Sequence, residues 1–363
     1  MKHLLQGSRR LLAVAALLGA VAVVTTLAAA TAATGLNSFV VHNLVSDVPG
    51  LADHTDASLV NAWGLTSLPT SPWWVADNET SVATLYRADG TKVVLTTPDI
   101  QVPNHPTGAA ANSSGNFVVT EGTNSGPARF LFDTEEGKVL GWSPAVSIAH
   151  AVVGADRSNV GAIYKGLAIS STQDTLYAAD FHNARVDVFD SSFHLLTLPG
   201  AFVDPKLPDG FAPFGIANLG GRIFVSYAKQ DADAEDEVAG QGLGFVDLYD
   251  QAGTFLQRVA NRGQLNAPWG LALAPAGFGP FGGDLIVGNF GDGRINAYAP
   301  EPTGTYDRVD GLRGTDNNPI VIDGLWALVF GKGAAANGPV DTLFFTAGPD
   351  DESHGLFGTI RAG

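Results

Sequence analysis

A pattern of short apolar segments recurs six times along this chain of 363 residues, and no other feature constrains its fold as strongly. In each copy a small residue, glycine five times and alanine once, stands directly before an apolar residue. Successive copies start 44, 58, 49, 55 and 57 residues apart. The six segments are Trp63-Gly64-Leu65, Thr107-Gly108-Ala109, Lys165-Gly166-Leu167, Phe214-Gly215-Ile216, Trp269-Gly270-Leu271 and Trp326-Ala327-Leu328.

A second apolar run follows each opening segment, and a third run of alternating apolar and polar residues follows the second. A turn then leads to a fourth, more polar segment, such as 92–97 or 254–259. The second runs are expected at 73–76, 117–120, 175–179, 222–227, 284–288 and 342–347. The third runs end in aromatic residues: Tyr86, Phe132, Phe189, Tyr249, Tyr298 and Phe357. Period-two alternation between glycine-rich turns indicates strands. Four strands in each repeat of about 40–50 residues are typical of propeller blades.

The sequence therefore predicts an all-β fold, a six-bladed β-propeller. The last repeat stops near 357–360 without a fourth strand, whereas a spare apolar segment lies at 38–45. We expect this N-terminal strand to complete the last blade, because closing the ring removes an open sheet edge. Glycine in the innermost strands has a matching reason, since a residue without Cβ lets backbones approach closely at the axis.

Residues 1–33 have the pattern of a secretory signal peptide. Lys2, Arg9 and Arg10 precede an apolar stretch, and small residues follow it. The paired arginines loosely match a twin-arginine signal. An uncleaved membrane anchor is the alternative, because 11–33 is long enough to span a bilayer. The sequence predicts an exported, secreted protein with one propeller domain at 34–363 and no membrane segment after cleavage.

Composition excludes several classes of function. Asp and Glu number 36 against 20 Lys and Arg, so the formal net charge is −16. Such an acidic chain does not suit nucleic acid, because phosphate binding needs a basic surface. The chain has no Cys, which excludes disulfides, thiolate metal ligands and a thiol nucleophile. We expect a monomer whose stability comes from packing and strand pairing.

Several repeats resemble NHL propellers, most closely LYAAD at 176–180 followed by RVDVF at 185–189. Over nearly all of 34–363 the chain is similar to a family of exported bacterial propeller proteins of unassigned function, some of which end in PEP-CTERM sorting tails. The matching stretches include LVNAWG at 59–64, NFGDGRI at 289–295 and FTAGPD at 345–350. The chain ends at Gly363 without such a tail, so the resemblance favours release. It implies no catalytic residue.

Binding groups in propellers gather on loops at the mouth of the central channel. Polar residues follow the second strands, and one histidine precedes the inner strand of the second repeat. Carboxylates and amides converging from several blades would suit Ca²⁺, which prefers oxygen ligands. The alternative is that they cap turns by accepting backbone hydrogen bonds. The candidates are Asp77, Asn78, His105, Glu121, Asp180, His182, Asn289, Asp292 and Asp350.

Three further features leave alternatives open. His105, His182 and His354 come from different blades, and would form a Zn²⁺ or general-base site if they met at the axis. Otherwise they are separate loop histidines. The acidic loop 231–237 is a solvated charge run or a Ca²⁺ loop. The tryptophans before the small residue of the inner strands pack between blades or form an aromatic floor for a ligand.

We therefore expect a rigid binding platform whose channel mouth holds a small molecule, a glycan or a partner protein. The alternative is a metal-dependent hydrolase or lyase, with Ca²⁺ or Zn²⁺ held by ligands from several blades. No nucleophile motif or catalytic set is evident in the sequence to decide between these two functions.

Overall fold

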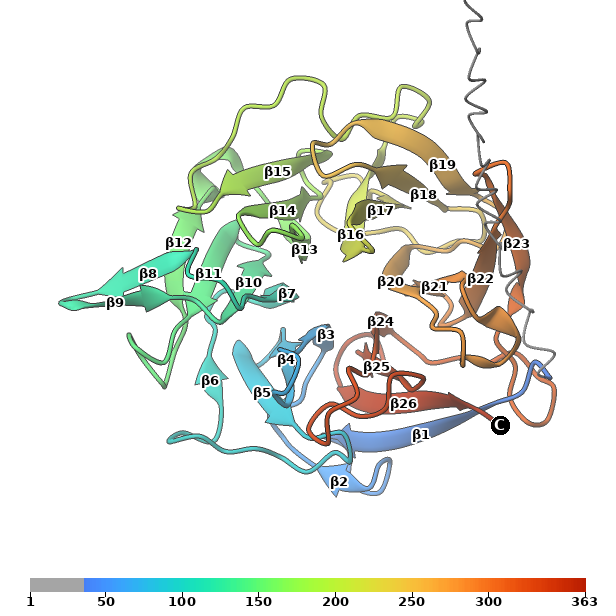
Figure 1. Cartoon of the computed structure of the whole chain (residues 1–363), viewed down its shortest axis with the longest axis horizontal. Helices are drawn as coiled ribbons and strands as arrows, with labels where there is room; N and C mark the ends of the chain where they lie inside the picture. The colour runs from blue at the N-terminus through green and yellow to red at the C-terminus, as the bar shows by residue number, and fades with distance from the viewer. Residues whose placement is uncertain (1–35) are drawn as a thin grey trace, which may run out of the picture. The chain divides into compact units, whose positions relative to one another are not determined.

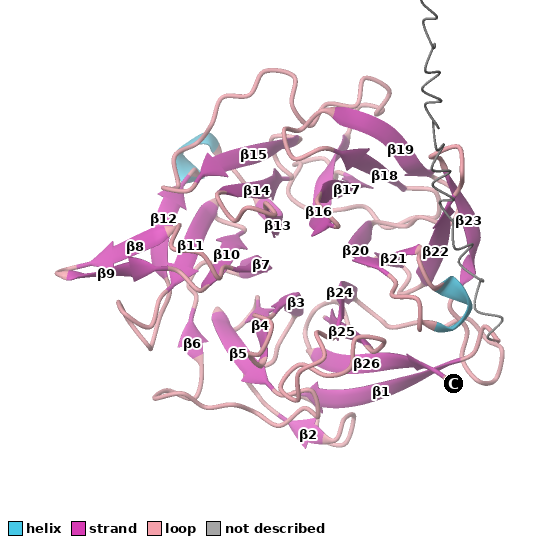
Figure 2. Ribbon diagram, viewed as in Figure 1, coloured by secondary structure: helices cyan, strands magenta, loops and turns pink. Residues whose placement is uncertain are grey.

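The computed structural model describes residues 36–363, in which six β-sheets are arranged around a central axis and a seventh, two-stranded sheet forms a separate hairpin (Figure 1). The predicted signal peptide at 1–33 lies outside the described residues. Strands and loops make up almost all of the ring (Figure 2), with two short 3-10 turns, η1 (Ser158–Val160) and η2 (Gly279–Phe281). The prediction of an all-β, six-bladed propeller is confirmed. No helix among residues 36–363 is long and apolar enough to cross a membrane.

The blades are numbered in the order of their inner strands, and each is given from the axis outwards. Blade one is β3 (Ala62–Thr66), β4 (Trp73–Asp77), β5 (Val82–Tyr86) and β6 (Ile100–Gln101). Blade two is β7 (Pro106–Ala111), β10 (Phe130–Thr134), β11 (Lys138–Trp142) and β12 (Val152–Asp156). Blade three is β13 (Tyr164–Ile169), β14 (Thr175–Asp180) and β15 (Arg185–Asp190).

Blade four is β16 (Phe211–Leu219), β17 (Arg222–Lys229), β18 (Gly244–Tyr249) and β19 (Phe255–Asn261). Blade five is β20 (Pro268–Leu273), β21 (Leu285–Asn289), β22 (Ile295–Pro300) and β23 (Tyr306–Gly311). Blade six is β24 (Leu325–Phe330), β25 (Leu343–Ala347), β26 (Leu356–Ala362) and β1 (Phe39–Ser46), and β2 (His54–Thr55) lies along the outside of β1.

The two ends of the described chain close the ring. β1 runs antiparallel to β26, with Phe39 opposite Ala362 and Ser46 opposite Leu356, and the two strands lie side by side in Figure 1. The Phe39 ring is 1% exposed and stacks at 5.9 Å on Phe281 of blade five. The predicted N-terminal strand thus completes blade six and also anchors it to the preceding blade.

Every inner strand has a bulge at its small residue, and the bulge explains the repeated glycine. A Cβ added to Gly64 would lie 2.5 Å from the carbonyl oxygen of Thr107 in the next blade, and one added to Gly270 would lie 2.5 Å from that of Trp326. The second strand supports the bulge in some blades, as when Ser226 accepts the Gly215 N–H at 3.0 Å. The inner strands therefore contact one another directly, backbone to backbone.

The strand assignment of the second repeat was wrong. Residues 117–120 were expected to form the second strand, but β8 (Val118–Glu121) pairs with β9 (Asn124–Pro127) as a separate hairpin. The second strand is β10, which is fully buried, and the third is β11. An inserted hairpin has the same period-two pattern as a blade strand, so periodicity did not separate them. The outer strand of blade one is likewise β6 at 100–101, not 92–97.

Candidate functional site

The two ends of the axis differ in chemistry. Neighbouring inner strands contact each other at matching positions, so they all run in the same direction along the axis. We call the end where inner strands begin and second strands finish the polar face. We call the end where the inner strands finish the open face. Aromatic side chains fill the axis between them.

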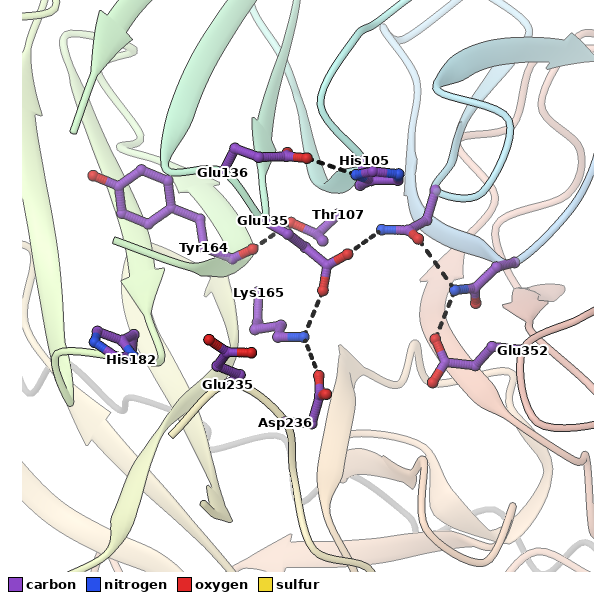
Figure 3. Close-up of polar contacts among 12 residues, drawn as sticks. His105, Thr107, Glu135, Glu136, Tyr164, Lys165, His182, Glu235, Asp236 and Glu352 are labelled. Carbon is purple, nitrogen blue, oxygen red and sulfur yellow. Dashed lines mark hydrogen bonds and ion pairs between the residues drawn. The ribbon is translucent and has the colours of Figure 1, made fainter. Parts of the chain in front are cut away.

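A hydrogen-bonded network lies at the centre of the polar face (Figure 3). Glu135, which follows β10, accepts from Lys165 at 2.6 Å and from the amide of Asn78 at 3.0 Å. Lys165 also contacts Asp236 at 3.1 Å, and Asn61 donates to Glu352 at 2.6 Å. Five blades contribute to this polar network, which consists of Asn61, Asn78, Glu135, Lys165, Asp236 and Glu352.

Lys165 is the cation of the network and is only 2% exposed. Its ammonium group lies 5.3 Å from the centre of the Trp63 ring. Burial alone would lower the pKa of Lys165, but the carboxylates of Glu135, Glu237 and Asp236 outweigh burial and raise it. Lys165 therefore stays charged, and its attraction holds the pKa of Glu135 below the ordinary value although burial opposes this.

The surrounding acids are held in different protonation states. Burial raises the pKa of Glu237 to about 8, and burial also raises the pKa of Glu352. Lys165 thus favours the ionised form of Glu135, whereas burial favours the protonated form of Glu237.

Of the residues predicted from the sequence, Asn78 belongs to the network and His105 lies beside it. Nδ1 of His105 is 2.6 Å from a carboxylate oxygen of Glu136, and this hydrogen bond raises the pKa of the histidine. His182 is on the same face, where its Nδ1 lies 3.2 Å from the backbone oxygen of Ala234 in the acidic loop. The loop 231–237 also provides Asp236 to the network, so it is tied to the axis through Lys165.

Four predicted residues form hydrogen bonds within their own blades, and the bonds of Asp180, Asn289 and Asp292 lie at turns. The buried Asp77 accepts the Thr84 N–H at 2.9 Å, and burial raises its pKa well above the ordinary value. Asp180 accepts from the Asn183 amide at 2.8 Å. Asn289 donates to Asp292 at 2.9 Å, which closes the turn after β21.

Glu121 and Asp350 lie apart from the polar network. Glu121 is on the β8–β9 hairpin, where its carboxylate is 3.0 Å from Nε2 of His150. Its prediction as a channel residue was wrong because the hairpin strand had been assigned as the second strand of the blade. Asp350 is exposed, and its carboxylate lies 4.0 Å from His354, which bonds to Asp47 at 2.8 Å. Among residues 36–363, no three His, Asp or Glu side chains come together in a way that would hold a metal ion.

The sequence contained signals for two residues that were missed. The second strand of blade two is β10, and Glu135 directly follows it. Asn78 has the same position in blade one, where it directly follows β4. Lys165 occupies the position that Trp63, Trp269 and Trp326 occupy in other repeats. A lysine among tryptophans at a buried repeat position indicates a nearby carboxylate, because a buried charge needs a partner.

The aromatic plug between the two faces is formed by Trp63, Trp326, Trp269 and Phe290. The Trp63 and Trp326 rings stack with centres 3.5 Å apart, and Phe290 stacks on Trp326 at 4.0 Å. Trp269 meets Trp326 edge-on and donates its indole N–H to the backbone oxygen of Lys165 at 2.7 Å. The tryptophans therefore pack between the blades, as one of the two interpretations expected.

An axial cavity of about 420 Å³ opens at the open face. All six inner strands line it, and Trp269 of the plug forms part of its wall. Its polar groups include Asn218, whose amide donates to the backbone oxygen of Ile169 at 2.8 Å. Lys332 stands at its rim, donates to the backbone oxygen of Ser67, and has a pKa that burial lowers. Every blade contributes apolar residues to the lining, among them Leu65, Ala110, Leu167, Ile216, Leu271 and Leu328.

The chain is similar in sequence to proteins of Acanthamoeba polyphaga mimivirus. An uncharacterised protein of this virus is 35% identical over 332 residues, covering 88% of the chain and 79% of the relative. A second uncharacterised mimivirus protein is 33% identical, covering 88% of the chain and 85% of the relative. The chain belongs to the same family as these two proteins. No family model matches it.

Solved structures share the fold at low sequence identity. A structural genomics protein of unknown function from Bacteroides thetaiotaomicron is 11% identical with a TM-score of 0.57, covering 89% of this chain and 76% of its own. A glucose dehydrogenase is 12% identical with a TM-score of 0.52, and virginiamycin B lyase from Staphylococcus aureus is 12% identical with a TM-score of 0.51. The matches to the dehydrogenase and to the lyase each cover 89% of this chain and 99% of the other chain. These likenesses establish the propeller architecture and no activity.

Proposed function

We propose that this protein is a rigid binding platform that holds a small molecule in the axial cavity of the open face. The observation that carries the proposal is the cavity itself, about 420 Å³ in volume and lined by all six blades. A concave, mostly apolar pocket with a few polar groups is the usual form of a small-molecule site. A protein partner needs a larger surface than such a hollow offers.

The lining indicates what kind of molecule binds. The walls combine aliphatic side chains with hydroxyl and amide groups, and Trp269 adds an aromatic surface. The polar side chains are those of Thr66, Ser67, Ser113, Ser170, Ser171, Gln173 and Asn218. Lys332 at the rim is the cation that lines the cavity, and the residues lining it include no carboxylate. This arrangement fits a compact molecule that has both apolar and polar groups and whose acidic group stays near the rim, where Lys332 pairs with it.

Two fluorescent probes test this proposal, anilinonaphthalene sulfonate and phenylnaphthylamine, which have similar aromatic bodies but differ in charge. We expect both probes to bind, and Ala217→Trp, which fills the cavity, to weaken both about tenfold or more. Lys332→Met should weaken the sulfonate about two- to fivefold and leave the neutral probe unchanged, since a rim ion pair contributes up to about 1 kcal/mol.

The control is Ala252→Trp, on an exposed turn outside the cavity. If Ala217→Trp and Ala252→Trp bind both probes as the unsubstituted protein does, the cavity is not the binding site.

The polar face is a second candidate binding surface. The observation in its favour is the buried Lys165 facing three carboxyl groups from two other blades. Two of the predicted residues lie on this face, where Asn78 bonds to Glu135 and His105 bonds to Glu136. A metal-dependent hydrolase or lyase there would gain thermal stability from Ca²⁺, Mn²⁺ or Zn²⁺ by mass action. Unchanged melting temperatures with all three metals would count against that enzyme.

Export and the bacterial family stay proposals. The predicted signal at 1–33 is tested by expressing the full chain and sequencing the N-terminus of the released protein. Cleavage near residue 33 supports secretion. Retention of the intact chain inside the cell contradicts it. The proposed kinship with exported bacterial propellers, some with PEP-CTERM tails, and with NHL propellers rests on the sequence resemblance described above.

A further inference from the structure

A second, smaller pocket lies at the outer part of blade five, away from the axis. Its volume is about 160 Å³, and it is formed where β22 begins, where β23 ends, and by the segment that follows β23. Three arginines line it: Arg294, Arg308 and Arg313. Such a gathering of cations is unexpected in a chain whose formal net charge is −16.

The charges of these arginines are mostly not neutralised by the protein. Within residues 36–363, neither Arg294 nor Arg308 forms an ion pair with a carboxylate. Arg313 has a single acidic partner, Asp310, at 3.5 Å. Asp310 is also held by the Asn37 amide at 3.1 Å. Three guanidinium groups and one carboxylate leave the pocket with a local charge of about +2.

A buried amide in the pocket lacks an acceptor. Asn296 lines the pocket and is 2% exposed. Its Oδ1 accepts from Nε of Arg308 at 3.1 Å, but its Nδ2 has no hydrogen-bond partner. An unsatisfied buried donor costs roughly 1–3 kcal/mol. An acceptor oxygen in the pocket would satisfy Nδ2 and would meet the free guanidinium groups at the same time.

We infer that this pocket binds a tetrahedral oxyanion of the size of a phosphate group. Guanidinium groups present planar, forked donors that match phosphate oxygens, and such charge-assisted hydrogen bonds are roughly twice as strong as neutral ones. A local charge of about +2 matches a phosphate that carries close to two negative charges at neutral pH. The pocket is too small for a whole nucleotide or a sugar chain, so the recognised group is the phosphate itself.

Calorimetric titration with inorganic phosphate at low salt tests this inference. We expect the unsubstituted protein to bind phosphate, sulfate to compete, and acetate to compete at least tenfold more weakly. Arg294→Gln and Arg308→Gln should each weaken binding about tenfold or more, whereas Arg361→Gln, an exposed arginine outside the pocket, should not. Added KCl should weaken binding.

Arg294 keeps the experiment informative if Arg308→Gln unfolds, because the side chain of Arg294 is exposed and makes no hydrogen bond within residues 36–363. The inference is overturned if phosphate produces no heat beyond dilution. It is also overturned if Arg294→Gln and Arg361→Gln bind phosphate equally, or if acetate competes as well as sulfate. The last result would indicate a carboxylate site instead.

Discussion

Replacing Lys165 with methionine is expected to destabilise the fold, and more strongly at pH 8 than at pH 5. The side chain is 2% exposed and pairs with Glu135 and Asp236. Removing one partner of a buried ion pair costs about 3–5 kcal/mol. Asp236 is 72% exposed, so water screens part of the loss, and we expect roughly 2–3 kcal/mol at pH 8.

The expected change in melting temperature follows from the size of the domain. Unfolding entropy is about 2.1 cal/mol/K per residue, which gives about 0.7 kcal/mol/K for a domain of roughly 330 residues. The melting temperature of Lys165→Met should therefore fall by about 3–4 °C at pH 8. Calorimetry or circular dichroism measures this, with Lys206→Met as the control, because Lys206 is exposed and its ammonium makes no ion pair within residues 36–363.

The pH dependence has a definite sign. The folded pKa of Lys165 is raised, so its contribution is fully present below the unfolded value of 10.5 and is lost as the pH rises through the folded pKa. Without Lys165, the buried Glu135 loses its partner and resists ionisation, as Glu237 and Glu352 already do. The penalty of the substitution should thus grow from pH 5 to pH 8.

Glu135→Gln in the Lys165→Met background should recover part of the loss at pH 8. The reasoning is refuted if Lys165→Met lowers the melting temperature no more than Lys206→Met, or if its penalty is larger at pH 5.

Three more predictions concern the ring. Gly215→Ala should lower the free energy of unfolding by about 1–3 kcal/mol in denaturant titrations, because the added Cβ would meet the backbone of the next blade. Gly115→Ala is the control and should have a smaller effect, because a Cβ there faces open space. Equal effects of the two substitutions would contradict the packing argument. Phe39→Ala should cost about 3–5 kcal/mol, since its ring is buried, and the half-exposed Val40→Ala should cost less than 1 kcal/mol. Burial raises the pKa of Asp133 from 3.8 to about 7, so Asp133→Asn should reduce the loss of stability between about pH 4 and pH 7; an unchanged slope there would contradict that assignment.

The fold was predictable because its main constraints act through local sequence. The bulges of the first five inner strands leave no room for a Cβ, so a glycine recurs in each copy up to Gly270. The ring has to close, so a spare strand at one end matches a missing strand at the other. Blade two was misread because the β8–β9 hairpin alternates as a blade strand does, and this error moved the predicted acidic residue from Glu135 to Glu121.

The sites were less predictable because they depend on what meets across the axis. Lys165 gains its partners from loops of other blades, and nothing in its own repeat specifies them. The aromatic plug blocks the axis below the polar face, whereas the small Ala109 and Ala110 leave room at the open face. Which end of a channel is hollow depends on the summed side-chain volumes of all six inner strands. The prediction that ligands bind at the polar face therefore depended only on the polarity of the residues after the second strands.

A crystal structure of the protein grown with anilinonaphthalene sulfonate tests the central claim most directly. We predict six blades joined by β1 and β26, with the probe inside the axial cavity, its rings near Trp269 and its sulfonate near the ammonium of Lys332. A probe bound at the polar face or between blades, with the axial cavity closed, would contradict this account.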